Sequence, residues 1–89
     1  MLIPVFLNRF HKDVKKARKQ GKDIDKLKLI TRQLVEQKPL AARHRDHLLT
    51  GNYNGRRECH IEPDWLLIYR LDDDRIVFER LGSHSELFR

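Results

Sequence analysis

The sequence predicts an α+β fold, in which two N-terminal helices pack on one face of a small, mainly antiparallel sheet in the order β-α-α-β-β-β. Apolar residues recur at helical spacing between residues 9 and 38, whereas residues 56–81 contain short apolar segments typical of strands. Turn-forming residues separate these segments. A length of 89 residues gives room for a single domain, residues 1–89.

A short strand and a helix are expected at the N-terminus. The apolar segment Ile3–Leu7 predicts the strand, and Asn8 is a suitable N-cap for a helix over residues 9–20. Gly21 can supply the C-terminal cap of this helix. Its apolar stripe consists of Phe10, Val14 and Ala17.

A second helix follows, which Asp23 or Asp25 can cap and which Pro39 closes. Its apolar stripe consists of Ile24, Leu27, Ile30 and Leu34. We expect the two helices to form an antiparallel hairpin, with their lysines outside and their apolar stripes on the sheet.

The second half predicts three strands after an irregular connector over residues 40–55, which has turn signals at residues 51–52 and 54–55. The expected strands cover residues 56–62, 65–71 and 75–81, and the tail 82–89 is expected to hold one helical turn. Turns are expected at Pro63-Asp64 and at Asp72–Asp74.

The segment RRECHIEPDW, residues 56–65, places many ionisable groups beside a segment that is plainly buried. Successive strand residues point to opposite faces, so Cys59 and Ile61 are expected to face the helices and His60 the other face. That second face has no predicted cover. A small domain needs a functional reason to leave a sheet face free.

The charge distribution favours a polyanionic partner. Residues 1–45 carry 13 Lys and Arg against 4 Asp and Glu, a net charge of +9, whereas residues 46–89 carry 6 against 9, a net charge of −3. A surface polarised in this way attracts nucleic acid. The alternative interpretation is a solvated helical face, which is common for lysines in helices.

Several classes of protein lack support in the sequence. No apolar run approaches the ~20 residues of a membrane span, and the N-terminus lacks the pattern of a signal peptide. Cys59 is the only cysteine, so no internal disulfide forms, and a cytoplasmic protein is expected. No zinc-deaminase, H-E-x-x-H or glycine-rich phosphate motif is present, and no spacing indicates a metal or cofactor site.

Acid–base groups concentrate in the second half. They are His44, His47, His60 and His84, with Glu58, Glu62, Glu79, Asp64, Arg57 and Arg80. Histidine titrates near neutrality and arginine binds phosphate with a rigid fork. The combination suits cleavage of RNA through its own 2′-OH, which needs a base, an acid and a cation.

Each candidate also has a simpler interpretation. His44 is expected to be solvated, and His47 is as suited to loop packing as to a site. A simpler interpretation of His60 is ion pairing with its neighbours Glu58 and Glu62, and Trp65 is as suited to the core as to stacking on a base.

Two stretches carry a resemblance to a known family: DHLLTGNYNGRRECHIEPDWLLIYRL and FERLGSHSELF. Together with the lysine-rich pair KDVKKARKQGKDIDKLK, they resemble the YafQ branch of the RelE-like toxins, nearly end to end. These toxins are mRNA endonucleases of bacterial type II toxin–antitoxin systems. The resemblance implies the same fold, and metal-independent cleavage of mRNA in the ribosomal A site.

The resemblance also implies roles for individual residues. The family's catalytic positions fall on His47, His60, Asp64, Arg80 and His84, and its stacking aromatic positions on Trp65 and Phe88. The lysines of the basic helices would grip ribosomal RNA: Lys12, Lys15, Lys16, Lys19, Lys22, Lys26 and Lys28. No cofactor and no metal are implied.

The implied partners are the translating ribosome with its mRNA and a cognate antitoxin encoded by an adjacent gene. The resemblance also implies a complex with the antitoxin that can bind operator DNA through the antitoxin. Two rival functions stay open, which are a non-catalytic module that binds RNA or a partner, and a nuclease that acts on free RNA.

Overall fold

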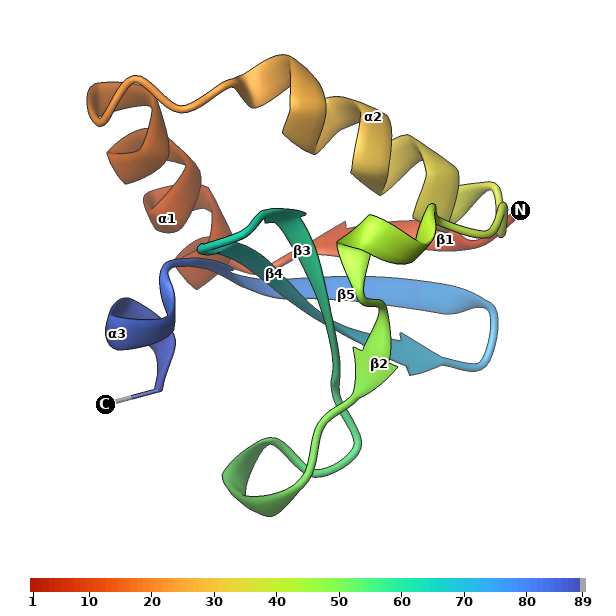
Figure 1. The fold of residues 1–89 in the computed structure, drawn as a ribbon. Coiled ribbons are helices and arrows are strands. Elements are labelled where there is room, and N and C mark those ends of the chain that lie inside the picture. Colours follow the sequence, from red (N-terminus) through yellow and green to blue (C-terminus); the bar gives the residue numbers. More distant parts are fainter. Residues whose placement is uncertain (89) are drawn as a thin grey trace.

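A computed structural model describes residues 1–88, which form a five-stranded sheet covered by two helices (Figure 1). The strands are β1 (Ile3–Phe6), β2 (His47–Leu48), β3 (Arg57–Glu62), β4 (Trp65–Asp72) and β5 (Arg75–Gly82). Their spatial order is β1-β5-β4-β3-β2. Strand β1 runs parallel to β5, and all other pairs are antiparallel. The predicted α+β class is therefore confirmed.

Helices α1 (Asn8–Lys19) and α2 (Ile24–Val35) lie on one face of the sheet. Their predicted stripes supply the buried residues Phe10, Ala17, Leu27, Ile30 and Leu34 of the main core, and Cys59 and Ile61 point toward them as expected. The antiparallel hairpin was not correct. The helices diverge from the turn between them and make little contact with each other, because each packs on the sheet (Figure 1).

The turn between the helices follows the predicted chemistry. Gly21 has a φ of +77°, its N–H donates to the carbonyl of Arg18, and the N–H of Lys22 donates to the carbonyl of Ala17. This is a Schellman motif, which satisfies the last carbonyls of α1. The carboxylate of Asp23 then caps α2 by accepting from the backbone N–H groups of Asp25 and Lys26.

The N-cap of α1 differs from the prediction. Leu7 is the N-cap, without a side-chain cap bond, and Asn8 is already the first helical residue. The N–H of Leu7 donates to the carbonyl of Phe78, 3.2 Å away, which keeps Leu7 extended as a continuation of β1. The helix therefore starts one residue earlier than the side-chain chemistry suggested.

The connector contains more structure than expected. Two short 3-10 helices, η1 (Ala42–His44) and η2 (Gly51–Tyr53), flank strand β2, in which His47 pairs with Glu58. A strand of two residues has no alternation to reveal it in a sequence. Its formation depends on the free edge of β3.

The second sheet face is not free. The final helix α3 (His84–Leu87) confirms the predicted helical turn, and its Leu87 packs with Leu66 and Ile68 of β4 in a second apolar cluster. Leu49 and Tyr53 complete the cover, and the Tyr53 hydroxyl donates to the Leu87 carbonyl over 3.0 Å. Within residues 1–88, no helix is long and apolar enough to cross a membrane.

Candidate active site

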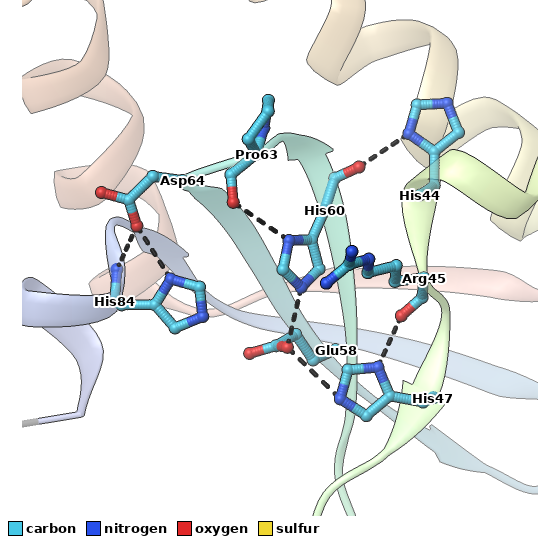
Figure 2. Close-up of polar contacts among 8 residues, drawn as sticks. All are labelled: His44, Arg45, His47, Glu58, His60, Pro63, Asp64 and His84. Carbon is cyan, nitrogen blue, oxygen red and sulfur yellow. Dashed lines mark hydrogen bonds and ion pairs between the residues drawn. The ribbon is translucent and has the colours of Figure 1, made fainter.

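Glu58 is a buried carboxylate that lies between two histidines on the face opposite the helices (Figure 2). Its Oε2 is 3.2 Å from Nε2 of His60 and 3.4 Å from Nε2 of His47. Glu58 and His60 come from β3, and the pairing of β2 with the edge of β3 brings His47 beside them. Strand alternation thus places three ionisable groups on one face.

The other ring nitrogens of these histidines face backbone carbonyls. Nδ1 of His47 is 2.5 Å from the carbonyl oxygen of Arg45, and Nδ1 of His60 is 3.2 Å from that of Pro63. A carbonyl only accepts, so each Nδ1 carries a proton and each Nε2 faces Glu58. The carboxylate therefore lies within reach of two imidazole nitrogens, and a hydrogen bond to either one needs a proton between the oxygen and the nitrogen.

His84 forms a second histidine–carboxylate pair, with Asp64. Oδ1 of Asp64 accepts from the backbone N–H of His84 at 2.9 Å and from its Nδ1 at 2.8 Å. These two bonds, the backbone one first, lower the pKa of Asp64 below its usual value. Among residues 1–88, no group hydrogen-bonds Nε2 of His84, so this nitrogen is available to a substrate.

The two units adjoin. The ring centroids of His60 and His84 are 5.7 Å apart, and those of His47 and His60 are 6.4 Å apart. Figure 2 shows the three rings approaching one another from β2, from β3 and from the start of α3. The arrangement offers two separate proton-transfer groups on one open surface.

The same groups could hold a metal ion. One ligand atom each from Glu58, His60 and His84 lie within 4.8 Å of one another, and imidazole with carboxylate is a donor set that suits zinc or copper. No spacing along the chain reveals this set, because His84 is far from β3 in sequence. A bound metal would occupy the nitrogens that proton transfer needs.

His44 is not solvated as expected. Its Nδ1 lies 2.7 Å from the carbonyl oxygen of His60, so it fastens η1 to β3 (Figure 2). The ring is half-buried and serves the backbone of the strand that carries His60. This contact ties the connector to β3.

Trp65 does not fit the predicted stacking role. Only 2% of the residue is exposed, and it packs in the main core beneath the helices, with the Lys22 ammonium 5.9 Å from the ring centroid. A buried ring offers no face to a base. Phe88, by contrast, is 40% exposed and lies 6.0 Å from the His84 ring.

Tyr53 is an aromatic residue that the sequence did not single out. Its ring meets that of Phe88 edge to face at 5.3 Å, and its hydroxyl holds the end of α3. Phe88, His84 and Tyr53 therefore form a continuous aromatic border beside the acid–base groups. Such rings are suited to base stacking.

Arg80 lies outside the histidine network. Its Nε and Nη2 donate to the two oxygens of Asp13 on α1, at 2.8 and 3.3 Å, and this pairing raises the pKa of Arg80. Ile68 pairs with Arg80 and Tyr69 with Phe78, so β5 has one extra residue at this point. The bulge breaks the expected alternation, and Leu81 takes the core position after Phe78.

The seven lysines differ in their surroundings. All are exposed except Lys22, which is half-buried over Trp65. Lys16 pairs with Glu86, and Lys26 with Glu62 at 3.0 Å. Within the described chain, the exposed lysines of this set without an ion pair are Lys12, Lys15, Lys19 and Lys28. These four are the most accessible to a polyanion.

Comparison with known proteins identifies the family. The family model described as the bacterial toxin of type II toxin–antitoxin systems, YafQ, matches residues 3–89. The chain belongs to the YafQ family. It is 45% identical over 84 residues to the mRNA interferase toxin YafQ of Escherichia coli K12, across 93% of this chain and 91% of that protein. The sequence resemblance is therefore confirmed.

Solved YafQ structures share the whole fold. The crystal structure of YafQ from E. coli BL21(DE3) has a TM-score of 0.94 at 41% identity and covers 100% of both chains. YafQ in the E. coli DinJ–YafQ complex gives 0.92 at 42% identity, again over 100% of both. A metal-bound toxin from Helicobacter pylori gives 0.92 at 40% identity, over 99% of this chain and 100% of that one.

Proposed function

We propose that this toxin is an mRNA interferase that cleaves mRNA in the ribosomal A site through attack of the 2′-OH, without a metal ion. The observation that carries the proposal is the convergence of three fixed imidazoles, whose Nδ1 atoms are held by Arg45, Pro63 and Asp64. Imidazole rings held in a fixed orientation are what general acid–base catalysis requires.

The reaction needs two proton transfers at one phosphate. A base removes the 2′-OH proton, the 2′-oxygen attacks phosphorus, the P–O5′ bond breaks, and an acid protonates the 5′-oxygen. We assign the transfers to His47 and His84, which approach from different elements. Glu58, His60 and Asp64 orient and tune this pair. The products are a 2′,3′-cyclic phosphate and a 5′-hydroxyl.

Charge on the transferring phosphate needs a cation, and Arg80 is the family's position for it. Asp13 holds its guanidinium rigidly, with the side chain 21% exposed. Asp13 already accepts from Nε and Nη2, so a phosphate would have to be bound by the N–H donors that remain. Arg80 therefore contributes only if the substrate reaches the junction of α1 and β5.

The basic helices support a ribosome-dependent reaction. Exposed Lys12, Lys15, Lys19 and Lys28 lie on α1 and α2, the layer on the other side of the sheet from the histidines. Lysine contacts with phosphates give salt-dependent affinity without sequence readout. We assign these residues to ribosomal RNA, and the cytoplasm as the place where they meet it.

A toxin of this kind requires control by a partner. We infer that an antitoxin encoded by an adjacent gene binds this chain, as DinJ binds YafQ in the E. coli complexes. An acidic antitoxin segment would complement the half of the chain with net charge +9. The complex would contact operator DNA through the antitoxin.

One observation favours a second candidate. The Glu58, His60 and His84 ligand set, together with the metal-bound H. pylori toxin, is compatible with a metal-dependent nuclease. A metal-activated water would leave a 5′-phosphate, whereas attack of the 2′-OH leaves a 5′-hydroxyl.

Product ends therefore test the proposal. Translating ribosomes with a defined mRNA would be incubated with the toxin, and the new ends identified by kinase labelling and mass spectrometry. We expect 5′-hydroxyl and cyclic phosphate ends, and no cleavage of the same mRNA without ribosomes. A 5′-phosphate would overturn the mechanism, and cleavage of free RNA would overturn the ribosome dependence.

A further inference from the structure

The connector passes from one face of the sheet to the other between His44 and His47. His44 bonds to β3 from the η1 side, where the adjoining pocket is lined by α2 residues and Ile61. His47 lies on the opposite face beside Glu58. Arg45 makes the crossing with a φ of +45°, in the left-handed region that non-glycine residues rarely adopt.

Asp46 is the residue tied down at this crossing. Its Oδ1 accepts from the hydroxyl of Tyr69 at 2.5 Å and from Nε of Arg57 at 3.3 Å. Nε of Arg57 is also 3.3 Å from the Tyr69 oxygen, so the three groups form a closed triangle. All three side chains lie on the helix side of the edge of β3, away from the histidines.

Tyr69 makes this attachment rigid. It is 2% exposed, packs in the main core, and has the Phe78 ring centroid 6.4 Å from its own. Burial, and then the bond to Asp46, raise the pKa of Tyr69, so the phenol stays protonated and donates to the carboxylate. The loop is thus anchored to the main core of the molecule.

The anchor is adjacent to a proposed proton-transfer group. His47 follows Asp46 directly, and its Nδ1 depends on the carbonyl of Arg45, which precedes Asp46. Fixing Asp46 therefore fixes both the strand position of His47 and the carbonyl that sets its tautomer. No comparable anchor is needed for His84, whose own backbone N–H meets Asp64.

We propose that Asp46, through Tyr69 and Arg57, is a positioning residue that aims His47 at Glu58 and the scissile phosphate. This inference rests on the proposed function. A displacement of about 1 Å in a reacting group can cost on the order of 10²-fold in rate. The simpler alternative is that Asp46 only stabilises the connector, and the experiment separates the two.

The test is a double-mutant cycle on single-turnover mRNA cleavage by ribosome-bound toxin. The variants are Asp46→Ala, His47→Ala and the double variant, with Asp73→Asn as a matched control in an exposed turn. We expect Asp46→Ala to slow cleavage by about 10- to 100-fold. It should slow the His47→Ala variant no further, because the anchor acts only through His47. The ribosome affinity of every variant should stay within twofold of the wild-type value. The cleavage rate of the control Asp73→Asn should also stay within twofold of wild type. Circular dichroism checks that each variant is folded.

A second measurement does not depend on cleavage. Ring nitrogen NMR shifts report which nitrogen of His47 carries the proton. We expect a single Nδ1–H form in the wild type, mixed forms in Asp46→Ala and in Tyr69→Phe, and unchanged His84 signals.

The two measurements distinguish a failure of the positioning role of Asp46 from a failure of the proposed role of His47 in the reaction. An unchanged His47 tautomer in folded Asp46→Ala, or equal rate losses with and without His47, would overturn the positioning role. If His47→Ala itself cleaves at the wild-type rate, the assignment of His47 in the reaction fails, and the NMR result alone decides whether Asp46 positions the ring.

Discussion

Two histidine–carboxylate pairs face each other across the site, and they differ chiefly in burial. In the His60–Glu58 pair the side chains are 10% and 5% exposed, and in the His84–Asp64 pair 55% and 67%. Glu58 also serves His47, whereas Asp64 serves His84 twice, through ring and backbone. The buried pair is therefore part of the scaffold, and the exposed pair is free to meet a substrate.

The difference in burial predicts which substitution slows cleavage most. Replacing His84 with Ala should lower the single-turnover rate by roughly 10²–10⁴-fold, the usual contribution of one proton-transfer group. Because His84 is exposed at the start of α3, melting temperature and ribosome affinity should hardly change. Single-turnover cleavage, a ribosome-binding assay and circular dichroism measure the three quantities. A folded variant that cleaves within threefold of wild type would remove His84 from the reaction.

A metal ion bound by residues of both pairs should inhibit mRNA cleavage. Stoichiometric Zn²⁺ or Cu²⁺ should lower the cleavage rate, and a chelator should restore it, because Glu58, His60 and His84 would become ligands. Asp64→Asn should weaken metal affinity by about 10- to 100-fold, since Asp64 orients the His84 ring. Calorimetry on the isolated toxin measures the affinity. Stimulation of cleavage by the metal would favour the metal-dependent candidate.

For stability the order of the two pairs should be reversed, with the buried pair contributing more than the exposed pair. His60→Ala leaves Glu58 buried with one partner fewer, so the free energy of unfolding should fall by about 1–3 kcal/mol. His84→Ala should change it by about 0.5 kcal/mol or less, as is usual for an exposed side chain. Urea unfolding curves of both variants provide the comparison. Equal losses would mean that burial does not distinguish the two pairs.

The smallest expected effect concerns the pKa of Asp64. The folded value lies below the unfolded one, so the interaction stabilises the fold above the unfolded pKa and is lost as the pH falls through the folded pKa. The backbone N–H of His84 is the larger cause, and His84→Ala retains it. Carboxyl NMR titration should therefore show a pKa in the variant that rises only partly. A complete return to the ordinary value would assign the effect to the ring.

Much of the fold was predictable because its signals are local. Strand alternation placed Cys59 and Ile61 in the core and His60 opposite them, and the capping residues marked the turn between the helices. Strand β2 was not predictable, since its two residues are a strand only by pairing with β3.

The candidate site was predictable as a set of residues but not as a geometry. The contacts of Glu58 depend on β2, whose pairing with β3 brings His47 to the carboxylate. The bulge in β5 changes the direction of Arg80 and is not evident from the residues around it. Trp65 lies on the same face of β4 as Leu67 and Tyr69. Its ring therefore packs in the main core and is not available to stack on a base.

The central claim is that histidines activate the 2′-OH of the mRNA itself. The most direct measurement uses ribosomes programmed with two mRNAs that differ only in a single 2′-deoxy nucleotide at the scissile position. Wild-type toxin should cleave the all-ribose mRNA and leave the deoxy mRNA intact, while binding both ribosome complexes equally. Cleavage of the deoxy mRNA at a comparable rate would show that another nucleophile attacks, and would contradict the account.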